Sequence, residues 1–459
     1  MTEEKHSTPG KAHIVRKYVP REISADIGRL LDSMPVVVLT GMRQVGKSTM
    51  LVNDPRFADR EYVTLDDPVL QVALRENPDS ELSSYDRVTI DEAQKEDGLF
   101  LAIKRAVARD ETRGRFLLSG SASLPLKKAT AESLAGKAIY RRIMPMTRRE
   151  ISRDIKQEPF LLNFIRKPRK VRNLDVKPVT DDEVMRGGMP QVVLSTKQAG
   201  EIWLAGYEQT YLERDVLYLS RIENLVGFKT MLRLLAARTG QILNLNQVAT
   251  DAELPHNTAK RYLGLLEELF IFQRVFPFTR SLRSGIRKSP KLFLSDTGIA
   301  CHMAGCRNLS GHPLRGFMYE TYTFQNLLGI MEAHSAGWTV NYWRIDETRE
   351  VDLVIDTREQ VVGIEVKAGE QLRKKDIRSL RTFMEAVPEC RLCILAYNGV
   401  EVVNLGDGIW AVPLLRNAGQ ALSRLSVPDV KRHSGSKHKD NLVDYLIRVL
   451  HVPRQSTPG

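Results

Sequence analysis

Short apolar runs alternate with amphipathic segments from residue 18 to about residue 150. The apolar runs predict buried strands at residues 35–39, 62–65, 87–91 and 115–121. The amphipathic segments predict helices at residues 23–32 and 99–109 and a helix that begins at Lys47. This alternation is typical of an α/β fold. We expect a doubly wound parallel sheet that binds its ligand at the carboxyl ends of the strands.

Helical periodicity returns in the middle of the chain, where residues 201–219 and 225–238 are predicted to be helical. Two further helices and a β-ribbon then follow in the order of a winged helix-turn-helix, at residues 245–254, 258–269, 271–278 and 291–294. Residues 150–200 are basic and poorly patterned. We interpret them as a solvated connector, with a nucleic-acid contact as the alternative.

The last part of the chain alternates in a different way. A helix, three strands, a helix and a strand are predicted in that order, at residues 316–333, 338–345, 350–355, 361–367, 373–386 and 392–397. This order is αβββαβ, so the region is expected to form a mixed sheet of its own.

Composition adds limits on class and location. The chain has 459 residues, of which 42% are hydrophobic and 27% are charged, as in an ordinary globular protein. No apolar run approaches the ~20 residues of a membrane span, and the polar start lacks the apolar core of a signal peptide. We therefore expect a cytoplasmic protein without membrane contact. The net charge of +12 permits nucleic-acid binding without requiring it.

Four cysteines are too few for a disulfide framework in a chain of this length. Cys390 and Cys393 lie three residues apart in a predicted strand, where their side chains are expected to point to opposite faces. We therefore expect buried thiols rather than a zinc site.

The first motif with chemistry lies at residues 39–49. Gly41, Gly46, Lys47 and Ser48 fit the phosphate-binding P-loop pattern, with a predicted strand before it and a helix after it. The residues expected to bind ATP are Gly41, Met42, Arg43, Gln44, Val45, Gly46, Lys47, Ser48 and Thr49. Lys47 is expected to neutralise the β- and γ-phosphates, and Ser48 to bind Mg²⁺.

Two carboxylates end the predicted strand at residues 87–91. Asp91 and Glu92 follow mostly β-prone residues, as in the Walker B element of P-loop ATPases. We expect Asp91 to hold Mg²⁺ through water and Glu92 to orient and activate the attacking water. Ser119 and Ser121 lie at a strand end where AAA-type ATPases place a γ-phosphate sensor, and we select Ser119. The alternative, acidic and serine residues at strand ends by chance, is disfavoured by the P-loop in the same domain.

Several motifs together extend this resemblance, at residues 41–49, 65–67, 90–94, 118–121, 133–136, 186–190, 211–215 and 295–298. From about residue 17 to residue 420 the chain resembles the prokaryotic AAA-type P-loop ATPases that carry a C-terminal domain of unknown function. The resemblance implies binding and hydrolysis of ATP with Mg²⁺. Relatives commonly have arginine where this chain has Lys137. The arginine that acts on a neighbouring subunit therefore stays unassigned among Arg113, Arg115 and Arg214.

Basic residues gather around the predicted winged helix. Lys260 and Arg261 lie outside the apolar stripe of the second helix, and residues 271–291 include six basic residues and no acidic one. The residues expected to contact duplex DNA are Lys260, Arg261, Arg283, Arg287 and Lys288. Because Glu267 and Glu268 lie on the same helix, a protein contact is the alternative.

Charged residues of the last region are spaced as in restriction-endonuclease-like enzymes. The αβββαβ order and the D…E-x-K set of Asp352, Glu365 and Lys367 resemble that core. Glu365 and Lys367 are two residues apart and share one face of a strand. We expect Asp352, Glu365 and Glu320 to hold Mg²⁺, and Lys367 to position or deprotonate the attacking water. The alternative is a set of ion pairs between neighbouring strands.

These patterns divide the chain into six segments. They are a disordered tail at 1–17, an ATPase domain at 18–150, a connector and helical lid at 151–240, a winged helix-turn-helix at 241–299, a restriction-endonuclease-like domain at 300–427 and a basic tail with a short helix at 428–459.

Three functions are compatible with this organisation. The first is an ATP-hydrolysing AAA-type protein that acts on DNA, with a nuclease-like domain whose activity is open. The second is a nucleotide-controlled scaffold that recognises protein or DNA without cleaving it, and the third is a regulator that works through its winged helix. The first is favoured over the second by the intact Glu92 and by the complete set of Glu320, Asp352, Glu365 and Lys367. ATP and DNA are the expected partners, and the sequence leaves open whether copies of the chain assemble.

Overall fold

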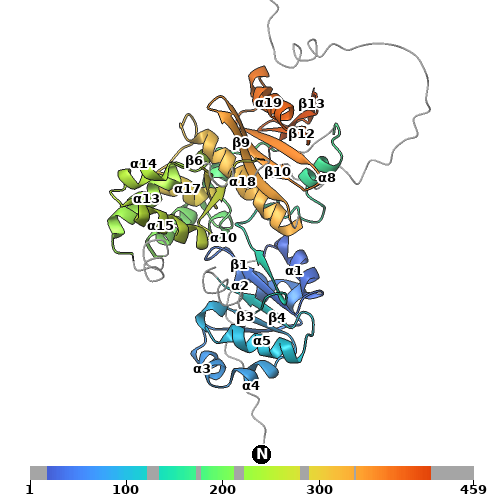
Figure 1. Cartoon of the computed structure of the whole chain (residues 1–459), viewed down its shortest axis with the longest axis vertical. Coiled ribbons are helices and arrows are strands. Elements are labelled where there is room, and N and C mark those ends of the chain that lie inside the picture. Colours follow the sequence, from blue (N-terminus) through green and yellow to red (C-terminus); the bar gives the residue numbers. More distant parts are fainter. Residues whose placement is uncertain are drawn as a thin grey trace, which may run out of the picture. The chain divides into compact units, whose positions relative to one another are not determined.

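The computed structural model describes residues 18–120, 134–171, 177–210, 222–279, 289–334 and 337–414 (Figure 1). The contacts divide the chain into two compact units. The first contains Met1–Thr40, Gly46–Gly120 and Pro125–Arg141, and the second contains Gly41–Val45, Ser121–Leu124 and Arg142–Gly459. The two expected tails, at 1–17 and 428–459, lie outside the described residues.

A five-stranded sheet forms the centre of the first unit. Its strands are β1 (Val36–Thr40), β2 (Glu61–Thr64), β3 (Val88–Asp91), β4 (Phe116–Ser119) and β5 (Ala138–Arg142). They lie in the order β2-β3-β4-β1-β5, and the pairs β2/β3, β3/β4 and β4/β1 are parallel. The predicted α/β fold with a parallel sheet is confirmed. The sequence did not predict β5, because its five residues are only half-buried and two of them are arginine.

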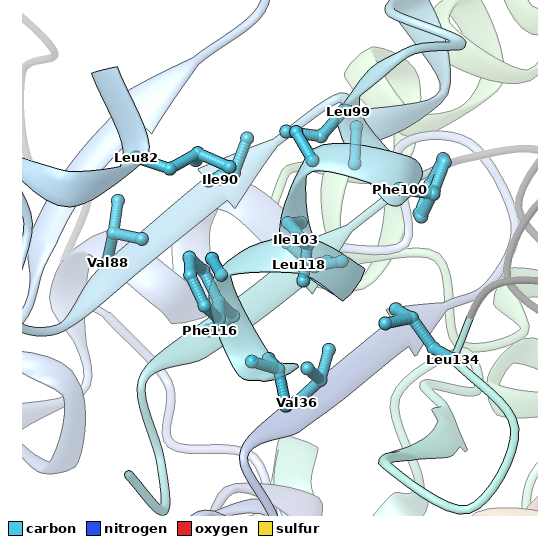
Figure 2. Close-up of a cluster of buried hydrophobic side chains, with 14 of the residues drawn as sticks. Val36, Leu82, Val88, Ile90, Leu99, Phe100, Ile103, Phe116, Leu118 and Leu134 are labelled. Atoms are coloured by element: carbon cyan, nitrogen blue, oxygen red, sulfur yellow. The ribbon is translucent and has the colours of Figure 1, made fainter. Parts of the chain in front are cut away.

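Helices cover this sheet, and the element bounds agree with the predicted ones to within a few residues. They are α1 (Ile23–Leu31), α2 (Lys47–Asn53), α3 (Pro68–Glu76), α4 (Pro78–Ser83) and α5 (Leu99–Arg109), with short 3₁₀ turns η1 (Pro55–Phe57) and η2 (Ala93–Lys95). Leu99 and Ile103 of α5 pack with Phe116 and Leu118 of β4 in one buried cluster (Figure 2). Each such side chain contributes about 1.5–3 kcal/mol by leaving water, so this cluster fixes the strand ends that carry the motifs.

The second unit begins with short helices where the sequence predicted a connector. They are α7 (Arg148–Ile151), α8 (Phe160–Arg166), α9 (Asp181–Arg186) and α10 (Pro190–Val193). The next helix, α11 (Lys197–Tyr207), overlaps the predicted helix at residues 201–219, of which residues 211–219 lie outside the described residues. The interpretation of residues 150–200 as a solvated loop is therefore wrong for much of the segment. Helices of four to seven residues are too short to show a helical period, although α8 buries Phe160, Leu162 and Phe164.

A helical group with a small antiparallel sheet follows. Its elements are α13 (Leu225–Ala237), β6 (Gln241–Ile242), α14 (Leu245–Asp251), α15 (His256–Glu268), β7 (Phe272–Val275), β8 (Lys291–Leu294) and α17 (Thr297–Met303). The sheet order is β6-β8-β7, with both pairs antiparallel. The two predicted helices and the ribbon are confirmed, and the predicted stripe of α15 is buried at Tyr262, Leu263 and Leu266.

The C-terminal sheet has six strands. The elements are α18 (Arg315–His334), β9 (Thr339–Asp346), β10 (Arg349–Asp356), β11 (Val361–Lys367), η4 (Lys374–Ile377), α19 (Arg378–Ala386), β12 (Cys390–Tyr397), β13 (Val403–Gly406) and β14 (Ile409–Pro413). The strand order is β13-β14-β12-β11-β10-β9, with parallel and antiparallel pairs. The predicted αβββαβ order is confirmed, and β13 and β14 extend the sheet beyond it.

A β-bulge changes the expected placement of the two cysteines of β12. Cys390 pairs with Val361 while Leu392 pairs with Val362, so Arg391 is an extra residue in the strand. The extra residue reverses the alternation, and the Cys390 and Cys393 sulfurs lie 3.5 Å apart. The expectation of opposite faces is wrong for this reason, whereas both thiols are free and buried as predicted. Within the described ranges, every helix is too short or too polar to cross a lipid bilayer.

Candidate functional site

The predicted P-loop joins a buried strand to a helix. All five residues of β1 are buried, and α2 begins at Lys47 with Gly46 before it at φ 100°. Gly41 and Gln44 also have positive φ, at 151° and 61°. Left-handed residues at this spacing turn backbone N–H groups toward one side of a loop, which is the geometry that holds phosphate oxygens. A side chain at Gly41 would place its first carbon 2.5 Å from the backbone oxygen of Ile143, so only glycine fits there.

The sheet order brings three predicted site residues to one edge. Strand β4 lies between β1 and β3, and all three run in the same direction. Leu39 is paired with Ser119, and Ile90 is paired with Leu118. The carboxyl ends of the P-loop strand, the Ser119 strand and the Asp91 strand therefore meet at one edge of the sheet, where doubly wound folds bind ligands.

Asp91 is the most constrained side chain of this edge. It is 2% exposed, and its carboxylate accepts hydrogen bonds from the Ser119 hydroxyl and, at 3.0 Å, from the Glu92 backbone N–H. The Tyr62 hydroxyl donates to the other carboxylate oxygen at 2.7 Å. Burial and the charge of Asp91 raise the pKa of Tyr62, so its hydroxyl stays a donor. Sequence reasoning missed Tyr62, because no motif singles out an aromatic residue on the neighbouring strand.

Glu92 has a backbone conformation that is rare for a residue other than glycine. Its φ is 52°, in the left-handed region, at a cost of about 1 kcal/mol. Two hydrogen bonds hold it there, from its own N–H to Asp91 and from the Lys95 N–H to its carbonyl oxygen at 2.9 Å. The Gln94 side chain donates to its carboxylate. Backbone strain of this kind is concentrated at functional sites, and here it sets the direction of the Glu92 side chain.

The arginine candidates differ in accessibility. Arg113 is exposed, whereas the Arg115 guanidinium lies 3.3 Å from the Asp110 carboxylate and donates to the Leu82 carbonyl oxygen at 3.1 Å. Lys137 forms an ion pair with Glu111 at 2.7 Å. Arg214 and Ser121 lie outside the described residues. Arg115 is engaged within its own chain, which leaves Arg113 as the accessible candidate among the described ones.

Two aromatic residues of α11 contact the first half of the P-loop, and all of these residues belong to the second unit. The Trp203 indole N–H donates to the Gln44 side-chain oxygen at 3.1 Å, and the Tyr207 hydroxyl to the Arg43 carbonyl oxygen at 3.4 Å. The two rings stack with centroids 4.8 Å apart. No sequence motif indicates these contacts, which hold the peptide between Arg43 and Gln44 from outside the loop.

Two of the predicted acidic residues, Glu320 and Asp352, lie around one lysine together with Glu350. Lys291 is 2% exposed, and its ammonium nitrogen lies 2.8 Å from Glu320, 2.5 Å from Glu350 and 3.5 Å from Asp352. Burial opposes the charge of Lys291, but Glu320, Asp352 and Glu350 outweigh it and raise the pKa, so the side chain is an ammonium. Neither Lys291 nor Glu350 was among the predicted site residues.

Glu365 lies at the side of this cluster. Leu353 is paired with Ile364, which makes Asp352 and Glu365 neighbours across β10 and β11. Glu365 forms an ion pair with Lys367 at 2.7 Å, and burial, with Asp352 beside it, raises its pKa to about 8. In the described parts of the chain, no group of three His, Cys, Asp or Glu side chains is arranged to hold a metal ion. The Lys291 ammonium group therefore lies beside Glu320 and Asp352, two of the three residues expected to hold Mg²⁺.

The predicted DNA-contact residues are described only in part. Lys260 and Arg261 are exposed on α15. Glu267, on the same helix, forms an ion pair with Arg274 of β7. Arg283, Arg287 and Lys288 lie outside the described residues.

Comparison with known families matches three consecutive regions. Residues 33–152 match an AAA domain, residues 179–310 match a domain of unknown function (DUF8612), and residues 315–416 match another (DUF4143). An uncharacterized protein of Mycobacterium tuberculosis is 27% identical over 415 residues, which cover 89% of this chain and 86% of the relative. An uncharacterized protein of Haemophilus influenzae is 21% identical and covers 73% of this chain and 83% of its own length.

Among solved structures, the Walker-type ATPase PABY2304 of Pyrococcus abyssi is 16% identical. The match covers 61% of this chain and 94% of that chain with a TM-score of 0.36, which is too low to support an argument. The family matches agree with the strand order and the P-loop. The chain carries a P-loop ATPase domain of the AAA type followed by two domains of unknown function.

Proposed function

We propose that the chain binds ATP with Mg²⁺ at residues 41–49 and hydrolyses it, and that it uses this cycle to act on DNA. Bound Mg·ATP supplies the bond that is broken. Lys47 would stabilise charge on the β- and γ-phosphates, and Ser48 and Asp91 would hold the ion. Glu92 would take a proton from the attacking water, and Ser119 would contact the γ-phosphate.

One observation carries this proposal. The carboxyl ends of β1, β4 and β3 meet at one edge, and the Ser119 hydroxyl is hydrogen-bonded to the Asp91 carboxylate there. Phosphoryl transfer needs a loop that binds the phosphates, a carboxylate for the metal ion and a polar group near the γ-phosphate. The P-loop, Asp91 and Ser119 of β4 are the groups proposed for these three roles. The strained φ of Glu92 adds support, because such backbone strain is concentrated at functional sites.

Replacing Lys47 by alanine is expected to abolish ATP binding, because the loop loses the ammonium group that neutralises the β- and γ-phosphates. Binding of a fluorescent ATP analogue and phosphate release, each with Mg²⁺ and with EDTA, test this expectation. Lys95→Ala is the matched control, since Lys95 is an exposed lysine of the same unit that pairs with Asp66 outside the motif. Unchanged binding in Lys47→Ala would contradict the site.

DNA is the second part of the proposal, supported by the exposed Lys260 and Arg261 on the second helix of the helical group. The element order α13, β6, α14, α15, β7, β8 is that of a winged helix, whose second helix–turn–helix member enters the major groove. The alternative is a nucleotide-controlled scaffold that recognises protein through the same helix. Stimulation of the ATPase rate by duplex DNA separates the two.

Neutralising Lys260 and Arg261 together is expected to weaken duplex binding and to lower the slope of log affinity against log salt by about 1.8, at about 0.9 per lost phosphate contact. Fluorescence anisotropy across a salt series measures both quantities. The matched control is Arg166→Ala with Lys167→Ala, an adjacent exposed basic pair in the same unit. Equal losses in both double variants would show general charge attraction, and no duplex affinity in wild type would favour the scaffold.

A further inference from the structure

The acidic cluster of the C-terminal region surrounds a single cationic atom. A lysine ammonium has three N–H donors. The three carboxylates of Glu320, Glu350 and Asp352 lie 2.5–3.5 Å from the Lys291 nitrogen. These ligands come from α18 and β10, whereas Lys291 comes from β8, the central strand of the small sheet. The ammonium group of β8 therefore lies between the carboxylate from α18 and the two carboxylates from β10.

Lys291 is the charge on which this cluster depends. Among described residues, Lys291 is the only ion-pair partner of Glu320, whose side chain is 7% exposed. Glu350 has one other cation nearby, the Arg344 guanidinium at 3.7 Å, and Asp352 also accepts the Val366 N–H at 2.8 Å. Lys367 neutralises Glu365 at the outer side of the cluster and is 37% exposed. Without Lys291, buried carboxylates would face one another with no cation between them, which is strongly unfavourable.

A second observation indicates that the cluster is built to hold a cation rather than a single ion pair. Glu365 is 8% exposed, and the carboxylate oxygen that does not bond Lys367 has no hydrogen-bond donor among the described atoms. Buried carboxylate oxygens without a donor are rare. Oxygen-only donor sets of this kind, with carboxylates as ligands, are those that Mg²⁺ and Mn²⁺ prefer.

We propose that this cluster is a divalent-cation site that the chain closes with its own ammonium group. Lys291 takes the place of the ion, and removal of its side chain opens a site for Mg²⁺ or Mn²⁺ among Glu320, Glu350 and Asp352. The intact region consequently binds no divalent cation at this position. This inference does not rest on ATP hydrolysis, because the cluster lies entirely within the second unit.

The test compares the full-length wild type with Lys291→Ala, without nucleotide, in a titration with Mn²⁺. Loss of the free Mn²⁺ signal in electron paramagnetic resonance gives the number of bound ions, and thermal unfolding gives the stability. Lys291→Ala is expected to bind one Mn²⁺ per chain more than wild type. Its lowered midpoint is expected to keep rising with each tenfold increase in free Mn²⁺, since the ion binds the folded state. Adding Asp352→Asn to Lys291→Ala is expected to remove both effects.

Lys367→Ala is the matched control, because it removes an equal charge from the outer side of the same cluster. It is expected to gain no Mn²⁺. Two results would overturn the proposal: a Mn²⁺-dependent shift or plasmid nicking in wild type that Asp352→Asn abolishes, or a folded Lys291→Ala that binds no additional ion. If Lys291→Ala does not fold, Lys291→Gln takes its place in the same titration, since its shorter neutral side chain still donates hydrogen bonds to the carboxylates.

Discussion

Replacing Glu92 by glutamine is expected to lower the ATP turnover number by a factor of about 100 or more and to leave ATP binding close to that of wild type. Glutamine keeps the size of the side chain and can still hydrogen-bond to a water, but it cannot accept the proton that the water loses. The backbone of residue 92 should be unaffected, because the bonds that hold its φ of 52° involve main-chain groups and Asp91.

The measurement is single-turnover hydrolysis with excess enzyme, together with the dissociation constant of a fluorescent ATP analogue. Asp97→Asn serves as the control, because Asp97 is an exposed carboxylate five residues further along the same loop region. Equal turnover in Glu92→Gln and wild type would show that Glu92 is not the base. A loss of binding and turnover together would instead assign Glu92 to the structure of the loop.

The parallel sheet and the positions of the motifs at its strand ends were predictable because their signals are local. Each of the motifs that end β1, β3 and β4 follows a short apolar run, and parallel strands must bring such ends to one edge. The same holds for the C-terminal sheet, where alternation and length placed β9, β10 and β11 within one or two residues of their observed bounds. In both sheets, the order and length of the predicted strands indicate which residues lie side by side on adjacent strands.

The features that sequence reasoning missed depend on contacts between distant segments. Lys291 is separated by 61 residues from Asp352, and nothing in its own strand indicates that its side chain enters the acidic cluster. Lys291 was counted instead among the six basic residues of segment 271–291, which follows α15. The bulge at Arg391 is a second case, because this one unpaired residue in β12 reverses the face of Cys390 relative to the rest of the strand.

Two of the motifs on which the resemblance rests, at residues 186–190 and 295–298, are in direct contact inside the second unit. The Gly188 N–H donates to Asp296 at 2.6 Å, and Asp296 also accepts the Ile299 N–H at 3.0 Å at the start of α17. A side chain at Gly187 would place its first carbon 2.4 Å from the Gly298 nitrogen, and one at Gly188 would lie 2.3 Å from the Met146 carbonyl oxygen. The glycines therefore permit the close approach, and Asp296 holds it.

Replacing Asp296 by alanine is expected to destabilise the second unit by about 2–6 kcal/mol, because two buried N–H donors lose their acceptor at about 1–3 kcal/mol each. Asp296→Asn should recover little of this loss, since its amide group would place N–H₂ against one of the two donors. Thermal unfolding followed by circular dichroism is the measurement. The control is Thr196→Ala, an exposed cap of α11 that accepts the Ala199 N–H at 3.3 Å and should matter less.

The pH dependence gives a second readout that a simple packing role would not produce. Asp296 is fully buried, and burial raises its pKa from 3.8 to about 6 although backbone N–H groups oppose the shift. The folded state therefore holds this proton more tightly than the unfolded state. Its contribution to stability is greatest below pH 4, decreases as the pH rises to about 6, and is constant above that value. The difference in unfolding midpoint between wild type and Asp296→Ala should shrink over that interval as the pH rises. A difference that stays constant from pH 4 to pH 8 would show that Asp296 is ionised throughout and that its hydrogen bonds outweigh its burial.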